Sequence, residues 1–152
     1  MPPDMTAGFP EAAARLVAAT DAIGVRALGD ALEAVPGMRE RYDDHGLRLL
    51  LRDTRIIVER VAKSVASGDP TWTREWTDWV APVYRRRGVP LDDVAALMQA
   101  IRGAAAPVLS EEERVPMNEA LDAAVAVCRY HRRFSGDARR RNPILAALYK
   151  GA

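Results

Sequence analysis

The chain has 152 residues, of which 49% are apolar and 28% are charged, and its net charge is +1. This balance is typical of one globular domain with a sizeable core and excludes a disordered chain. The single cysteine, Cys128, excludes an internal disulfide framework and predicts a cytoplasmic protein. We expect neither a signal peptide nor a membrane span, because no apolar run is long enough.

The charge is distributed unevenly along the chain. Residues 1–128 hold 15 basic and 20 acidic residues, whereas residues 129–152 hold seven basic residues and one acidic residue. We therefore predict a single domain, residues 1–152, with a basic C-terminal segment, residues 135–152. The simpler interpretation of this segment is a solvated helix end, and the alternative is an interaction tail. Its candidate residues are Arg132, Arg133, Arg139, Arg140 and Arg141.

Apolar residues recur at helical spacing, and the two-residue alternation of a strand is absent. Residues 10–35 predict a first helix, which Pro36-Gly37 ends. A second helical region covers residues 38–67. Gly68 is suited to closing it, and Asp69-Pro70 to beginning the next helix.

A third helix carries all three tryptophans, and Pro82 inside its pattern should kink it or weaken its last turns. A fourth helix follows Pro90 to about residue 105, and a fifth ends near residue 134. A short apolar segment, residues 144–149, comes last. Five main helices with short connections predict an all-α helical bundle, either a simple bundle or a globin-like one.

The tryptophans lie on one face of the third helix at four- and three-residue steps. The simpler interpretation is that they fill the core, because each indole buries a large apolar area. Alternatively they form a ligand or partner site with a cationic rim, suited to an anionic ligand or an acidic partner. The candidate binding residues are Trp72, Trp76, Trp79, Tyr84, Arg85, Arg86 and Arg87.

Metal and catalytic chemistry have little support. Cys128 and His131 can face one side of a helix, but a structural zinc site needs four ligands, so no metal site is predicted. A core histidine is the simpler interpretation, and an axial haem ligand is the alternative. The carboxylate pairs Asp43-Asp44 and Asp92-Asp93 are adjacent, so their members point to different sides of a helix. We expect no enzymatic activity and no cofactor.

The stretch YRRRGVPLDDVAALMQAIRGA, residues 84–104, resembles a pattern of helical regulatory domains. It is similar to the N-terminal sensor domains of RsbR-type stressosome co-antagonists and of PucR-like regulators. The preceding ASGDPTWTREWTDWV extends the resemblance, which covers about residues 47–134. The output domain that follows in that family is not among these 152 residues, so the resemblance implies a stand-alone sensor or adaptor that dimerises.

The sequence therefore predicts a non-catalytic regulatory sensor or protein-interaction domain in bacterial-type signalling. We expect it to act through dimerisation and helix repacking, as a homodimer with a protein partner. One alternative is a small-molecule or haem binding protein with His131 as the haem ligand. Another is nucleic-acid binding through the basic C-terminal segment, which the nearly neutral net charge makes less favoured.

Overall fold

The computed structural model describes residues 8–135, which form a bundle of α-helices without a strand in that range. The predicted all-α class is confirmed. None of the helices described is long and apolar enough to cross a membrane. The helices are α1 (Pro10–Ala18), α2 (Thr20–Ala34), α3 (Asp44–Ser67), α4 (Thr71–Arg86), α5 (Leu91–Ala105) and α6 (Glu111–Ser135), with short 3-10 turns η1 (Arg39–Arg41) and η2 (Ala106–Val108).

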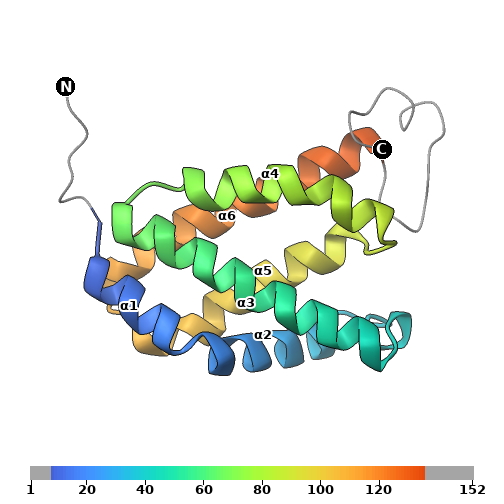
Figure 1. Ribbon diagram of the computed structural model, residues 1–152, viewed down its shortest axis with the longest axis horizontal. Helices are drawn as coiled ribbons and strands as arrows, with labels where there is room; N and C mark the ends of the chain where they lie inside the picture. The colour runs from blue at the N-terminus through green and yellow to red at the C-terminus, as the bar shows by residue number, and fades with distance from the viewer. Residues whose placement is uncertain (1–7, 136–152) are drawn as a thin grey trace.

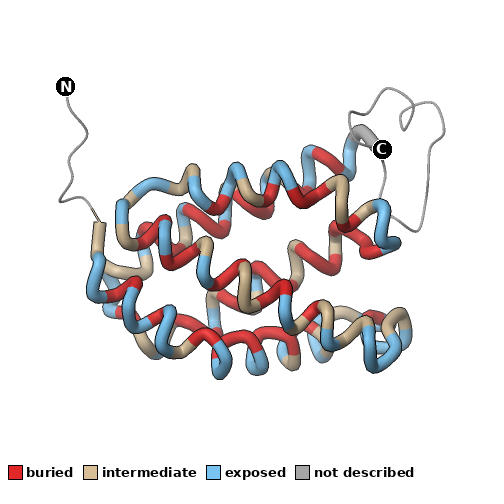
Figure 2. The backbone as a smooth tube through the Cα atoms, viewed as in Figure 1, coloured by how far each residue is buried: buried red, intermediate tan, exposed pale blue. Residues whose placement is uncertain are grey.

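Helix α3 is the central element of the bundle. In Figure 1 it lies between α4 at the top and α2 at the bottom, and it contacts every other α-helix. Helix α4 packs along α6, and α5 packs on both α2 and α6. Buried residues line the inner sides of the helices, and exposed residues cover the outside (Figure 2). This arrangement leaves the outer sides of α3 and α4 open to solvent beside each other.

The prediction of one helix over residues 10–35 is wrong, because the chain breaks at Ala19 into α1 and α2. The hydroxyl of Thr20 donates to the carbonyls of Leu16 and Val17, at 3.1 and 2.8 Å. A side-chain hydroxyl that bonds to the preceding turn competes with the backbone ladder and can end a helix. The apolar period continues through the break, so periodicity alone could not reveal it.

The predicted junction between the second and third helices is confirmed. Gly68 closes α3 with a φ of 69°, a left-handed conformation in which glycine avoids the steric cost of a Cβ. One carboxylate oxygen of Asp69 accepts a hydrogen bond from the backbone N–H of Thr71, at 2.9 Å, in the first turn of α4. Helix α4 then continues through Pro82. The tight junction sets α4 against α3 and so places the tryptophans beside α3.

Candidate ligand-binding site

An open groove runs between the outer sides of α3 and α4 and has a volume of about 420 Å³. We call it the tryptophan groove. Pockets of this size accept small organic ligands. Its lining residues are Arg60, Trp72, Glu75, Trp76 and Trp79.

The three indoles differ in burial. Trp79 is 69% exposed and Trp72 is 49% exposed, whereas Trp76 is partly buried against the core. The interpretation of the tryptophans as core residues is therefore wrong for Trp72 and Trp79. Large apolar side chains that gather on one open surface are typical of a binding site. The ammonium of Lys63 on α3 lies 5.5 Å from the centre of the Trp72 ring, within the range of a cation–π contact.

Trp72 and Trp79 face outward because the opposite side of α4 is well suited to burial. Thr73 and Thr77 are fully buried there, with Val80 one turn further along. Their hydroxyls are satisfied inside the bundle: Thr73 bonds to Ser64 of α3 at 2.8 Å, and Thr77 donates to the Thr73 carbonyl. With those hydrogen bonds made, threonine packs as a small apolar residue. Bulky indoles on that side would not fit between closely packed helices.

The structure does not place the expected cationic rim at the groove. Tyr84 is 1% exposed in the core, where burial raises the pKa of its phenol well above the usual range. Arg87 donates to the buried carboxylate of Asp53 at 3.0 Å, and its guanidinium lies over the Tyr84 ring. Neither Arg85 nor Arg86 is among the residues that line the groove. The end of α4 therefore contributes Tyr84 to the core and contacts α3 through Arg87.

Sequence reasoning missed the charged residues of the groove. Arg60 lines the groove from α3, and Glu75 lines it from α4, between the tryptophans. Lys63, three positions after Arg60, lies beside the groove over the Trp72 ring. The pairing of α3 with α4 is a tertiary contact that periodicity within one helix does not show. The available signal was the short Gly68-Asp69 junction, because short connections place consecutive helices side by side.

The candidate metal or haem residues lie away from the groove, on α6. The Nε2 atom of His131 lies 2.7 Å from a carboxylate oxygen of Asp78, which links α6 to α4. Cys128 is buried, with 2% of its surface exposed. In the part of the chain that the structure describes, no group of three or more His, Cys, Asp or Glu side chains is placed to hold a metal ion.

The candidate arginines of the predicted interaction tail are only partly described: Arg132 and Arg133 precede the segment 135–152 and lie within α6. The guanidinium of Arg132 forms an ion pair with Asp92 at 3.2 Å, within the chain. Arg133 is exposed near the end of α6. The predicted residues Arg139, Arg140 and Arg141, and the apolar segment 144–149, lie outside the described residues.

A model of the phycobilisome protein family matches residues 10–127, which include every helix of the bundle except the end of α6. The chain belongs to the phycobilisome protein family. The globin-like all-α fold of this family agrees with the observed bundle. No curated protein matches the chain.

Membership of this family corrects the functional expectation. The chain is not an RsbR-type or PucR-like sensor domain, so the resemblance over residues 47–134 was wrong. The family consists of light-harvesting proteins that bind a bilin pigment, so the expected role as a signalling sensor is also wrong. The misleading motif is a Gly-Val-Pro turn followed by two acidic residues. Helix capping produces that pattern in unrelated helical proteins.

Proposed function

We propose that the chain is a non-catalytic, small-molecule-binding member of the phycobilisome protein family and that the tryptophan groove holds the ligand. The observation that carries this proposal is the exposure of Trp72 and Trp79 along one open groove. Burial of this apolar surface against a ligand is favourable. Flat, conjugated ligands are favoured because aromatic rings stack on indoles. The pigment-binding character of the family supports the same class of ligand.

The absence of catalysis is part of this proposal. Within the described part of the chain, the ionisable side chains that line the groove are Arg60 and Glu75. A guanidinium stays protonated at neutral pH and does not serve as a general base. A single carboxylate beside it does not make the acid and base pair that most proton-transfer reactions require. Stacking and ion pairing, by contrast, need no proton transfer.

The assembly that we propose is a homodimer in the cytoplasm that also contacts a protein partner. Phycobilisome proteins assemble as oligomers with other subunits, which supports an interaction surface on this chain. Val17 and Val25, each more than half exposed on α1 and α2, offer apolar surface away from the groove. A reduced, buried Cys128 is compatible with the cytoplasm. Sedimentation of the purified chain across a concentration series would measure the dimer directly.

Intrinsic fluorescence tests the proposed site, because all three tryptophans of the chain line the groove. The probe is biliverdin, a free linear tetrapyrrole, and binding should quench the indole emission to saturation. Replacement Trp79→Ala should weaken binding by roughly fivefold, since a lost aromatic stacking contact costs on the order of 1 kcal/mol.

The matched control is Val115→Ala, which removes an exposed apolar side chain from α6. This variant should bind the probe as the parent does. The change in biliverdin absorbance gives a second readout that does not depend on the number of tryptophans. Unsaturable quenching, or equal affinity of the parent and the Trp79→Ala variant, would remove the groove as the site.

A further inference from the structure

A bilin can be fixed to a protein through a cysteine sulfur, and Cys128 is the one cysteine of this chain. Its side chain lies in the core, at the C-terminal half of α6, with 2% of the residue exposed. Helices α4 and α5 both pack against α6. Burial, with a smaller contribution from Asp92, raises the pKa of the Cys128 thiol to about 12. The thiol is therefore protonated at neutral pH and covered by protein.

Formation of a thioether makes two demands on a cysteine. The thiolate sulfur adds to a carbon–carbon double bond of the tetrapyrrole: a C–S bond forms, the π bond breaks, and the adjacent carbon takes a proton. The sulfur must therefore be ionised, and it must touch the ligand. Cys128 meets neither demand, and it is not among the residues that line the tryptophan groove. A thioether-linked bilin does not fit this chain.

The groove offers a different way to hold an acidic ligand. Arg60 lines it, and the Lys63 ammonium lies near the Trp72 ring, so α3 forms a basic edge along the indoles. Side chains three positions apart lie on the same side of a helix, so both cations can act on one ligand. A guanidinium pairs with a carboxylate through two parallel hydrogen bonds. Glu75 is the acidic residue of the opposite edge, on α4.

We propose that the tryptophan groove binds a planar, conjugated carboxylate reversibly, with its rings on the indoles of α4 and its carboxylates against Arg60 and Lys63 of α3. No bond to Cys128 forms. This inference rests on the proposed function and adds the charge of the ligand and its mode of attachment. It also predicts that Glu75→Gln strengthens binding, because the replacement removes a negative charge beside the ligand.

The mode of attachment is tested by mass spectrometry after incubation with biliverdin and denaturation. The expected result is the unmodified chain together with free pigment. A chain heavier by one biliverdin would overturn the inference.

Thiol labelling of the ligand-free protein is an independent test of the same point. Cys128 should react with a disulfide reagent roughly 100-fold or more slowly in the folded protein than in urea, because reaction requires opening of the core. The control is the double variant Cys128→Ser, Ser67→Cys, whose new thiol replaces an exposed side chain at the end of α3. This thiol should react equally fast with and without urea. Rapid labelling of the folded parent would overturn the inference.

The charge of the ligand is tested by comparing biliverdin with its uncharged dimethyl ester. The parent should prefer the diacid by roughly tenfold at low salt, since two exposed ion pairs can form with the diacid and neither can form with the ester. Added salt should reduce the preference. The double variant Arg60→Gln, Lys63→Gln should bind both compounds equally, whereas Arg48→Gln, an exposed control on α3, should keep the preference. Equal binding of both compounds by the parent would refute the ion pairs.

These outcomes separate this inference from the proposed function. If biliverdin binds and stays attached after denaturation, the groove function stands and reversible attachment is refuted. If the ester binds as well as the acid, the function stands and the basic edge is refuted. If neither compound quenches the indoles, the proposed function and the charge requirement both fail, and the labelling rate still reports on Cys128.

Discussion

The guanidinium of Arg41 and the carboxylate of Asp93 are joined by two hydrogen bonds, 3.0 Å from Nε to Oδ2 and 2.5 Å from Nη2 to Oδ1. The hydroxyl of Tyr42 donates to the same Oδ2 at 2.6 Å. Asp93 is fully buried in the first turn of α5, so these bonds replace its contacts with water. Burial and this carboxylate raise the pKa of the Tyr42 hydroxyl, which keeps it a donor. The network fastens η1 and the following residue to α5.

Replacement Asp93→Ala should therefore destabilise the fold by about 3 kcal/mol, because it leaves the partly buried Arg41 without its counter-ion. Urea unfolding measures the loss. The control is Asp30→Ala, which breaks an exposed pair with Arg26 at 3.7 Å and should cost less than about 0.5 kcal/mol. Equal losses in the two variants would mean that the buried network contributes no more than a surface ion pair.

Two glycines give opposite predictions for the same substitution. Gly88 has a φ of 76°, whereas Gly29 lies within α2, and a Cβ at either position would meet no atom within 4 Å. Gly88→Ala should cost roughly 1–2 kcal/mol, because the left-handed conformation strains an L-residue. Gly29→Ala should stabilise the protein by roughly 0.5–1 kcal/mol through helix propensity. Melting temperatures that move in the same direction would contradict the assignment of these backbone conformations.

The helical spacing of apolar residues predicted the fold class and most helix ends, because both depend on local physics. Gly68 closes α3, as helix C-cap preferences predict, and α5 begins at the residue after Pro90, close to the predicted start. The break at Ala19 was missed, since it depends on the Thr20 hydroxyl and not on apolar spacing. A helix can therefore end at a side-chain hydrogen bond while the helical spacing of apolar residues continues past that point. Such an end is hard to predict from the sequence.

The side of α4 that is buried could not be derived from hydrophobicity. Three indoles at helical spacing predict a core face, yet the structure buries Thr73 and Thr77 and exposes Trp72 and Trp79. The choice is decided by partners on α3, where Ser64 satisfies the Thr73 hydroxyl. Helix α3 also supplies the basic edge of the groove, through Arg60 and Lys63. The residue spacing within one helix consequently predicts only that helix's contribution to a site that two helices form.

The tryptophans should separate into structural and ligand-binding groups when each is replaced by leucine. Trp76→Leu should reduce the free energy of unfolding by about 1–3 kcal/mol, since Trp76 packs against the core and the smaller side chain leaves a gap. Trp79→Leu should change it by less than about 0.5 kcal/mol, because that side chain is mostly exposed. Denaturant unfolding followed by circular dichroism measures both. A large loss of stability in Trp79→Leu would show that this indole packs in the core.

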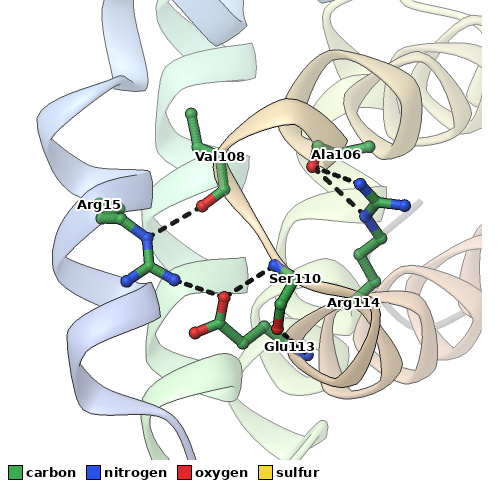
Figure 3. A network of polar contacts seen from close by, with 6 residues as sticks. All are labelled: Arg15, Ala106, Val108, Ser110, Glu113 and Arg114. Atoms are coloured by element: carbon green, nitrogen blue, oxygen red, sulfur yellow. Dashed lines mark hydrogen bonds and ion pairs between the residues drawn. The ribbon is translucent and has the colours of Figure 1, made fainter.

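A polar network fastens α1 to the beginning of α6 (Figure 3). The Glu113 carboxylate accepts a hydrogen bond from the Ser110 backbone N–H at 2.8 Å, and the Ser110 hydroxyl accepts one from the Glu113 N–H at 3.3 Å. This is a reciprocal capping arrangement at a helix N-terminus. Arg15 of α1 pairs with the same carboxylate and donates to the Val108 carbonyl at 3.0 Å. The bond from Ser110, and secondarily that from Arg15, lower the pKa of Glu113 below its ordinary value.

The lowered pKa of Glu113 predicts a loss of stability in acid. A carboxyl whose pKa is lower in the folded state contributes stability that is complete above its unfolded pKa. That contribution is lost as the pH falls through the folded pKa, because protonation removes the charge that Arg15 and the helix N-terminus attract. The stability advantage of the parent over Glu113→Gln should therefore be constant near neutral pH and should shrink below the unfolded pKa. Urea unfolding at several pH values measures it, with the exposed neighbour Glu112→Gln as control. An advantage that does not change with pH would show that the bonds of Glu113 do not depend on its charge.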